Sequence, residues 1–178
     1  MPSRFPRRLF ALALCGALAF ALLPGCDTTD PVPPVEPTEV TGVYDFTLFR
    51  FNPDPQFVPD AVVLDTLNQE MTSLELLDSG QFQFRYRLLG GLDNIINGTF
   101  TVNRDQVTLT FESGNQARLQ RLLLEPSLQF DRTDSETLTL SRTKRVDLEA
   151  YAEVYRDTGL DLTDVPGLLE IALNRRGR

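Results

Sequence analysis

Strict alternation of apolar and polar side chains over residues 81–88 is the feature that most constrains the fold of this chain. The apolar positions are Phe82, Phe84, Tyr86 and Leu88, and glutamine or arginine occupies each position between them. Because successive side chains of a strand point to opposite faces, this pattern predicts a strand with one buried and one solvated face. Phe82, Phe84 and Tyr86 should therefore point inward, while Gln83 and Arg85 face solvent.

Turn residues separate the alternating segments into successive hairpins. Asp78-Ser79-Gly80 joins a strand around Leu74 and Leu76 to the strand at 81–88. A second hairpin pairs 99–102 with 107–111 across Asn103-Arg104-Asp105, and a third pairs Leu128 and Phe130 with Leu138 and Leu140 across 131–136. Gly90-Gly91 and Asn97-Gly98-Thr99 are also interpreted as turns.

The opening strand and the C-terminal region complete the set of expected elements. Val43 to Phe51 places Tyr44, Phe46 and Leu48 on one face. Good helix formers fill Val146 to Arg156, and Gly159 follows, which predicts a short helix near the C-terminus.

Residues 168–175 have two interpretations. Leu169, Ile171 and Leu173 alternate as in a strand, whereas Asp164 and Pro166 could open a helix with Arg175 and Arg176 at its C-terminal end. We favour the strand, because it would supply the last strand of a closing barrel.

Successive hairpins of this spacing are typical of an antiparallel up-and-down meander. Free sheet edges invite aggregation, so a sheet of this length is expected to close on itself. We predict a mainly β domain over residues 40–178, a single barrel of about eight strands with a short helix near the C-terminus.

The first 26 residues have the layout of a secretory signal. Arg4, Arg7 and Arg8 precede fifteen uncharged residues from Leu9 to Leu23, a run that is short for a membrane-spanning helix. The run ends in Leu23-Pro24-Gly25-Cys26, which resembles the lipobox of bacterial lipoproteins. We therefore expect residues 1–25 to be a signal peptide and Cys26 to carry lipid; the alternative is an ordinary signal peptide with an incidental cysteine.

Residues 26–39 read as the lipidated cysteine followed by a tether. The stretch from Asp27 to Glu39 contains four prolines and no glycine, which favours an extended path of about 3.1 Å per residue. Cys15 would leave with the signal peptide, so Cys26 would be the one cysteine of the mature chain and no internal disulfide could form.

The charge of the chain restricts its partners. Removal of the three N-terminal arginines would leave 14 basic and 25 acidic residues, a net charge of −11. Such a surface disfavours nucleic acid, and the partner that we expect is the membrane, reached through the lipid anchor. The expected location is the bacterial cell envelope, with the outer membrane favoured over the inner.

The hairpin pattern resembles the lipocalin-like domains of bacterial lipoproteins. The resemblance rests on Gly42-Val43-Tyr44 at the first strand, the 74–82 hairpin, residues 97–111 and Thr137 to Arg142. Lipocalins open with G-x-W, and here Tyr44 stands in place of that tryptophan. The resemblance implies a barrel that can hold a ligand. It also offers Arg142 as the arginine that such families pack across the barrel end, with a solvated strand-end arginine as the alternative.

The sequence offers no catalytic constellation. It contains no histidine, so the commonest general base and the Ser-His-Asp and Cys-His arrangements are absent. A mature chain with one cysteine also cannot build a thiolate zinc site. Asp157, Asp161 and Asp164 lack the spacing of a calcium loop and are interpreted as solvated. We expect no enzyme, cofactor or metal site, although a carboxylate-pair hydrolase stays open because distances in space are not visible here.

Two functions remain. In the first, the barrel binds a small apolar molecule, and the inward aromatic residues line its site: Tyr44, Phe46, Phe84, Tyr86, Phe100 and Phe111. In the second, the same aromatic residues fill a solid core, and the protein is an envelope structural or assembly factor that acts through its surface.

Overall fold

The alternation at residues 81–88 forms a strand with the predicted facing. In β4 (Gln81–Arg87), Phe82, Phe84 and Tyr86 are buried and Arg85 is exposed, with Gln83 half-buried. The strand pairs on both sides, so its apolar face contributes to a core shared with its neighbours.

The computed structural model describes residues 39–53, 59–155 and 161–177. The chain divides into two units, residues 1–32 and 33–178, and all described residues belong to the second. The predicted signal peptide (1–25), Cys26 and the tether up to Thr38 lie outside the described residues. Within the three described ranges, no helix is long and apolar enough to cross a bilayer.

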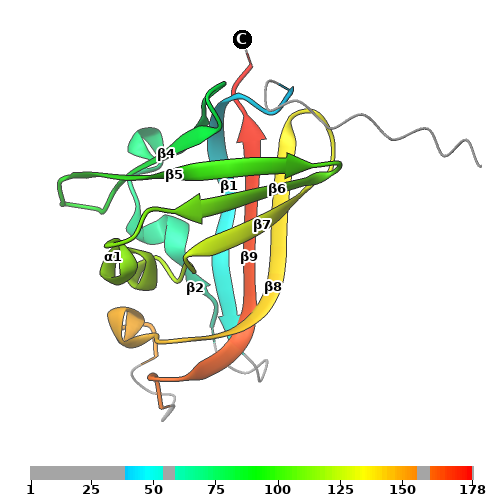
Figure 1. Ribbon diagram of the computed structural model, residues 1–178. Coiled ribbons are helices and arrows are strands. Elements are labelled where there is room, and N and C mark those ends of the chain that lie inside the picture. Colours follow the sequence, from blue (N-terminus) through cyan, green and yellow to red (C-terminus); the bar gives the residue numbers. More distant parts are fainter. Residues whose placement is uncertain (1–38, 54–58, 156–160, 178) are drawn as a thin grey trace, which may run out of the picture. The chain divides into compact units, whose positions relative to one another are not determined.

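Antiparallel strands in the described ranges form one sheet, and eight of them close into a barrel. Their order is β2-β1-β3-β4-β5-β6-β7-β8-β9, and β1 also pairs with β9 (Figure 1). The remaining bounds are β1 (Gly42–Pro53), β2 (Ala61–Val62), β3 (Ser73–Leu76), β5 (Asp93–Asn103), β6 (Gln106–Phe111), β7 (Ser127–Arg132), β8 (Thr137–Val146) and β9 (Val165–Arg175). This closed up-and-down meander is a lipocalin-like barrel, as the sequence predicts.

Long ladders join the two ends of the meander. The β1–β9 ladder runs from Tyr44–Arg175 to Pro53–Gly167, and β8 pairs with β9 from Thr137–Asn174 to Val146–Val165. The predicted strand at residues 168–175 is therefore confirmed, and the helical alternative is wrong.

A β-bulge shifts the facing of β1. The β1–β9 register shifts between Phe46 and Leu48, and Thr47 is exposed at the shift. Beyond it, Phe49 and Phe51 are buried while Leu48 is only half-buried. The prediction that Leu48 shares a face with Tyr44 is wrong, because one extra residue reverses the alternation of every residue after it.

Helical structure among the described residues is scarce, and most of it is not where the sequence predicts it. An α-helix, α1 (Gln116–Arg121), follows β6, and three 3₁₀ turns lie at η2 (Val63–Thr66), η3 (Gln69–Met71) and η4 (Glu149–Tyr151). The helix predicted over Val146 to Arg156 is reduced to η4. Val146 instead ends β8, since its pairing with β9 outweighs the helix propensity of the segment.

Gly98 lies inside a strand and not in the predicted turn. It pairs with Phe82 of β4 and Phe111 of β6, and a Cβ at this position would lie 2.5 Å from the Phe82 ring. Glycine is needed here because a Cβ would clash with the Thr110 carbonyl oxygen of β6 as well as with this ring. The turns predicted at 78–80, 90–91 and 103–105 are confirmed.

Candidate functional site

The predicted ligand-lining residues lie in the barrel core. Five of them are buried: Tyr44, Phe84, Tyr86, Phe100 and Phe111. The sixth, Phe46, is half-buried and packs against this core. The ring centroid of Phe84 is 5.3 Å from those of both Phe46 and Tyr86. Two core residues outside the predicted set join these rings, because Phe49 stacks on Phe46 at 5.6 Å and Phe82 meets Phe111 edge-on at 5.1 Å. Interior space near these rings is thus occupied by aromatic side chains.

Tyr44 lies at the end of the barrel where β1 begins. Its hydroxyl donates a hydrogen bond to the Val40 carbonyl oxygen at 2.8 Å, and the Arg175 guanidinium donates to the Thr41 carbonyl oxygen. Burial raises the pKa of Tyr44, and the charge of Arg175 opposes that shift. Gly42 has φ +143°, and a Cβ there would lie 2.7 Å from Arg175 Nε. Arg175 therefore lies against the start of β1 at this end of the barrel.

Arg142 is not the arginine at that end. Its side chain is 56% exposed and pairs with Glu125, with 2.9 Å between Nη1 and Oε2. The solvated alternative is the correct one, and the residue next to Tyr44 in the β1–β9 register is Arg175. Which of the two arginines is close to Tyr44 depends on strand pairing and not on local sequence.

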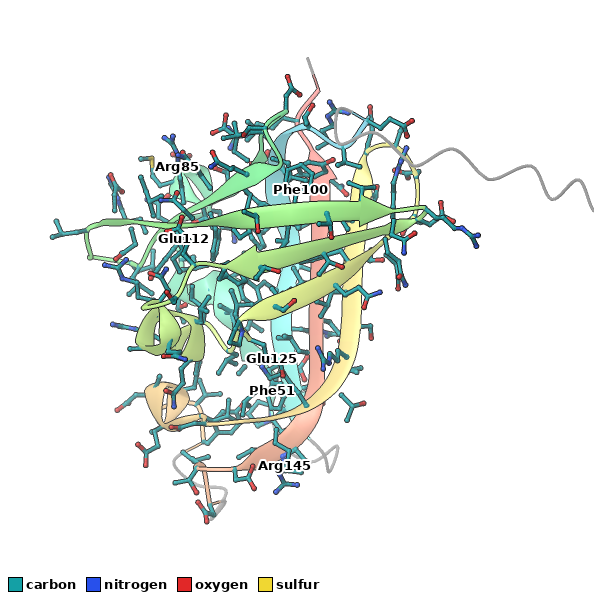
Figure 2. All side chains as sticks on the ribbon, viewed as in Figure 1. Phe51, Arg85, Phe100, Glu112, Glu125 and Arg145 are labelled. Atoms are coloured by element: carbon teal, nitrogen blue, oxygen red, sulfur yellow. The ribbon has the colours of Figure 1, made fainter. Side chains whose placement is uncertain are left out.

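The barrel wall is incomplete between β7 and β8. The two strands pair only at Asp131–Thr139 and Arg132–Leu138, so the predicted third hairpin exists but ends after two pairs. We call the unpaired stretch between residues 127–130 of β7 and 140–146 of β8 the parted seam. Two residues that follow α1 contact β8 there: the Glu125 side chain (Figure 2) pairs with Arg142 and Lys144, and the Leu123 carbonyl oxygen accepts a hydrogen bond from Lys144.

Lys144 joins the two sides of the parted seam. Its Nζ donates a hydrogen bond to the Leu123 carbonyl oxygen at 2.9 Å and lies 3.6 Å from Glu125 Oε1. The side chain is only 7% exposed, and burial lowers the pKa of its ammonium, with Glu125 opposing the shift. A lysine placed in this way is a buried cation held by one carbonyl and one carboxylate.

Leu123 adopts a backbone conformation that leucine rarely takes. Its φ is +57°, and the Leu124 N–H donates to the Leu119 carbonyl oxygen at 2.8 Å, which is the Schellman end of α1. Glycine is usual at this position, and another residue there costs about 1–2 kcal/mol. Strained residues of this kind cluster at functional sites. Here the strained residue supplies the carbonyl that Lys144 binds.

A pocket of about 330 Å³ opens at the parted seam. Its lining combines apolar side chains with polar and charged ones. The apolar residues are Leu119, Leu123, Leu124, Pro126 and Val146, and the polar and charged residues are Gln116, Gln120, Glu125, Lys144, Arg145 and Asp147. A second hollow of about 420 Å³ lies on the other side of Gln120 and Asp147, which line both. The hydrogen bond from Gln120 Nε2 to Asp147 Oδ2, 3.0 Å long, therefore lies between the two hollows.

Polar contacts hold α1 and η4 together beside this pocket. The Tyr151 hydroxyl donates to the Arg121 carbonyl oxygen at 3.2 Å, and burial raises the pKa of Tyr151 to about 12. Leu119 and Leu122 are buried beneath α1. The sequence does not predict α1, a role for Lys144 or the pocket. The only local signal is the helix-forming run Gln116 to Leu124, which follows Ser113-Gly114-Asn115.

The acidic loop contains no cluster of ligands in its described part. Asp161 accepts hydrogen bonds from the backbone N–H and the hydroxyl of Thr163, and Asp164 pairs with Arg145 at 2.8 Å. Asp157 lies outside the described residues. Within the described part of the chain, no group of three or more acidic or cysteine side chains is arranged to hold a metal ion.

Two solved structures are similar to this chain over most of its length. One is a lipocalin-like protein from Bacteroides uniformis, with 9% identity and a TM-score of 0.41, covering 78% of this chain and 99% of that one. The other is an uncharacterized protein from Bacteroides eggerthii, with 11% identity and a TM-score of 0.38, covering 77% of this chain and 99% of that one. No family model and no curated protein sequence matches the chain.

Proposed function

We propose that this barrel binds a small apolar molecule that carries an anionic group, and that the binding site is the pocket at the parted seam. The observation that carries the proposal is the pocket of about 330 Å³, whose lining contains both apolar side chains and Lys144. Its volume lies within the range of about 300–1,000 Å³ typical of small-molecule sites. The apolar walls would bind the body of the ligand, and the ammonium would bind its charged end.

Lys144 suits the anionic end because its present carboxylate partner is held loosely. The 3.6 Å between Nζ and Glu125 Oε1 is longer than a hydrogen bond, whereas Glu125 has a second partner in Arg142 at 2.9 Å. A ligand carboxylate could take the place of Glu125 at Nζ while Glu125 keeps its pair with Arg142. The exchange would leave no charge unpaired.

We further propose that the protein works without catalysis, held in the bacterial envelope by lipid on Cys26. The support is the apolar run from Leu9 to Leu23, the lipobox-like junction after it and the proline-rich tether. Detergent phase partitioning of protein purified from its host tests the anchor. The wild-type protein should enter the detergent phase and Cys26→Ser should not.

A second candidate is an envelope structural or assembly factor with a filled barrel. Aromatic stacking favours it, since the Phe46, Phe49, Phe84 and Tyr86 rings occupy the core at centroid distances of 5.3–5.6 Å. The two candidates differ in what the parted seam does. In the first it admits a ligand, and in the second it is only a packing irregularity.

A single introduced tryptophan separates the two candidates, because the chain has none of its own. Pro126 is exposed and lines the pocket, so we expect the emission of the Pro126→Trp variant to shift when a long-chain fatty acid is added. Gln129→Trp is the matched control, since Gln129 is exposed on β7 and outside the pocket lining. An unshifted emission at Pro126→Trp, with no displacement of a fluorescent fatty-acid analogue from wild-type protein, would leave the second candidate.

The charge requirement has its own test. Lys144→Met should weaken competition by the fatty acid about tenfold or more, since a charge-assisted hydrogen bond contributes about 1.5–3 kcal/mol. Competition by the corresponding fatty alcohol should not change. Equal weakening for both competitors would mean that Lys144 shapes the pocket without binding the anionic group.

A further inference from the structure

The turn between β4 and β5 exposes an apolar tip. Residues 88–92 read Leu-Leu-Gly-Gly-Leu and carry no charge. Leu89 is 65% exposed and Leu92 is 86% exposed, whereas the leucines that line the barrel core are almost all fully buried. Ile95, a short distance along β5, adds a side chain that is 46% exposed. We call Leu89, Leu92 and Ile95 the apolar tip.

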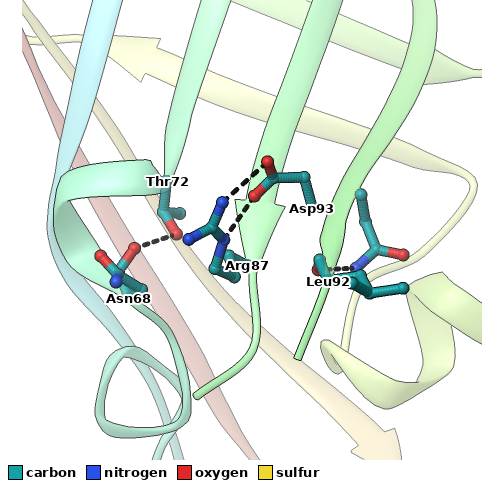
Figure 3. Close-up of polar contacts among 6 residues, drawn as sticks. Asn68, Thr72, Arg87, Leu92 and Asp93 are labelled. Atoms are coloured by element: carbon teal, nitrogen blue, oxygen red, sulfur yellow. Dashed lines mark hydrogen bonds and ion pairs between the residues drawn. The ribbon is translucent and has the colours of Figure 1, made fainter. Parts of the chain in front are cut away.

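The backbone beneath the apolar tip is held in place. The Leu89 N–H donates to the Thr66 carbonyl oxygen at 2.9 Å, and Leu67 bridges to Leu88. Asn94 Nδ2 donates to the Leu92 carbonyl oxygen at 2.9 Å, and Thr72 donates to the Asn68 carbonyl oxygen at 2.8 Å (Figure 3). The exposed leucines are therefore presented on an ordered turn and keep their position without burying their side chains.

The charges around the apolar tip suit phosphate groups. Asp93, which follows Leu92 in the chain, accepts two hydrogen bonds from Arg87, one of them 2.8 Å long (Figure 3). Ile95 lies beside Arg85 in the register and beneath Arg118, whose Nη1 lies 3.5 Å from the Ile95 carbonyl oxygen. Arg85 has Glu75 at 3.9 Å and a side chain that is 54% exposed. On a chain with a net charge of −8, this surface pairs exposed apolar groups with arginines.

We propose that the apolar tip inserts into the interface of a phospholipid bilayer. Leucines at the tip would enter the boundary between headgroups and acyl chains, while Arg85 and Arg118 would meet lipid phosphates. Two or three apolar side chains bury too little area to hold a soluble protein on a membrane by themselves. The contact therefore rests on the proposed lipid anchor, which would keep the barrel at high effective concentration next to the bilayer.

The tether is long enough for this contact. Glu39, its last residue, pairs with Arg132 at the end of the barrel opposite to the apolar tip. A proline-rich chain of thirteen residues, the length of 27–39, would reach up to about 40 Å. An eleven-residue strand such as β9 spans about 36 Å, and less along the barrel axis because barrel strands are tilted. A chain anchored at Cys26 can therefore turn the end of the barrel that carries the apolar tip toward its own membrane.

Tryptophan reporters in the lipidated full chain test the proposal. The chain is reconstituted into vesicles of phosphatidylethanolamine and phosphatidylglycerol, with brominated acyl chains as quenchers. On these vesicles, the Leu92→Trp variant should emit at shorter wavelength than it does in detergent-free buffer without vesicles, and the brominated lipid should quench its emission. Thr101→Trp, exposed on β5 at the far end of the barrel, should show neither effect.

Each failure of this experiment has its own signature. Wild-type protein that does not float with the vesicles would mean that the anchor is absent, which overturns the proposed anchoring and, with it, the tip contact. Floating protein with an unquenched Leu92→Trp reporter would overturn the tip contact alone. A blue shift that depends on protein concentration and needs no vesicles would show that the tip binds a second copy of the chain, which also overturns it.

Discussion

The barrel closes in two different ways at β9 and at the parted seam. β1 and β9 are joined by backbone hydrogen bonds over most of their length, from Tyr44–Arg175 to Pro53–Gly167. β7 and β8 pair at only two positions, and beyond them side-chain contacts such as Lys144–Glu125 link β8 to the residues that precede β7. Continuous ladders open only with global unfolding, whereas short side-chain contacts can open locally. The β1–β9 ladder therefore stabilises the closed barrel, and the parted seam is where the barrel wall can adapt.

Phe51→Ala should have the largest effect, because its ring is fully buried beneath the β1–β9 ladder. Emptying a buried aromatic site costs roughly 3–5 kcal/mol, measured by denaturant unfolding. Hydrogen exchange sharpens the comparison. Amides of β9 should exchange faster in the variant, while amides of α1, which open locally, should be little changed. Equal acceleration in both elements would show that the parted seam has no local opening of its own.

The pH dependence of stability should report on Tyr151, which joins η4 to α1. Its folded pKa of about 12 lies above the ordinary value of 10.0, so the folded state binds the proton more tightly than the unfolded chain. Stability is therefore intact below pH 10 and falls as the pH rises from 10 toward 12, by about 2–3 kcal/mol at roughly 1.4 kcal/mol per unit. Tyr151→Phe should remove this share of the fall in alkaline denaturation curves and leave that of Tyr155, whose pKa burial also raises to about 12. Parallel curves for the two proteins would contradict the assignment.

Gly167→Ala should destabilise the β1–β9 ladder by about 1–3 kcal/mol, the usual cost of overpacking. Gly167 lies opposite Pro53, and a Cβ there would be 2.5 Å from the Phe51 ring. Thermal denaturation measures the effect. Gly177→Ala is the control, since no atom lies within 4 Å of a Cβ at that position. A neutral Gly167→Ala would mean that both the Phe51 ring and the Asn52 carbonyl, the nearest atoms to the new Cβ, have room to move.

Arg142→Ala should have the smallest effect, within about 0.5 kcal/mol in denaturant unfolding. The Arg142 side chain is 56% exposed, and surface ion pairs contribute little. A larger loss would show that the Glu125 pairs contribute to stability at the parted seam.

Alternation predicts this fold well where the strands are regular. Phe82, Phe84 and Tyr86 face inward as expected, because β4 contains no irregularity. Leu48 does not, because the bulge at Thr47 follows from the fit between β1 and β9 and leaves no mark in the local sequence. Gly98 shows the same limit. Asn-Gly is typical of a turn, yet the glycine here makes room for the Thr110 carbonyl oxygen and the Phe82 ring.

The candidate site is less predictable than the fold. Its pocket forms because β7 and β8 separate and residues 122–126 fill part of the gap, and no single segment encodes that separation. In the sequence, Lys144 is indistinguishable from an outward-facing strand residue, and its role becomes visible only from its hydrogen bond to Leu123 in the folded chain. Arg175 is likewise recognisable as the barrel-end arginine only once the first and last strands are paired.

The β1–β9 ladder also governs when this chain can finish folding. Its pairs join residues more than one hundred positions apart, such as Asp45 and Asn174. The Asp45 carboxylate also pairs with the side chain of Arg176, just after β9, at 2.6–2.9 Å. The first strand to be synthesised must wait for the last, and a topology with such distant contacts folds slowly. Until then, both β1 and β8 expose unpaired backbone. A chain exported during synthesis would thus cross its membrane before β1 and β9 could pair. The barrel would then close only after export, on the other side of that membrane.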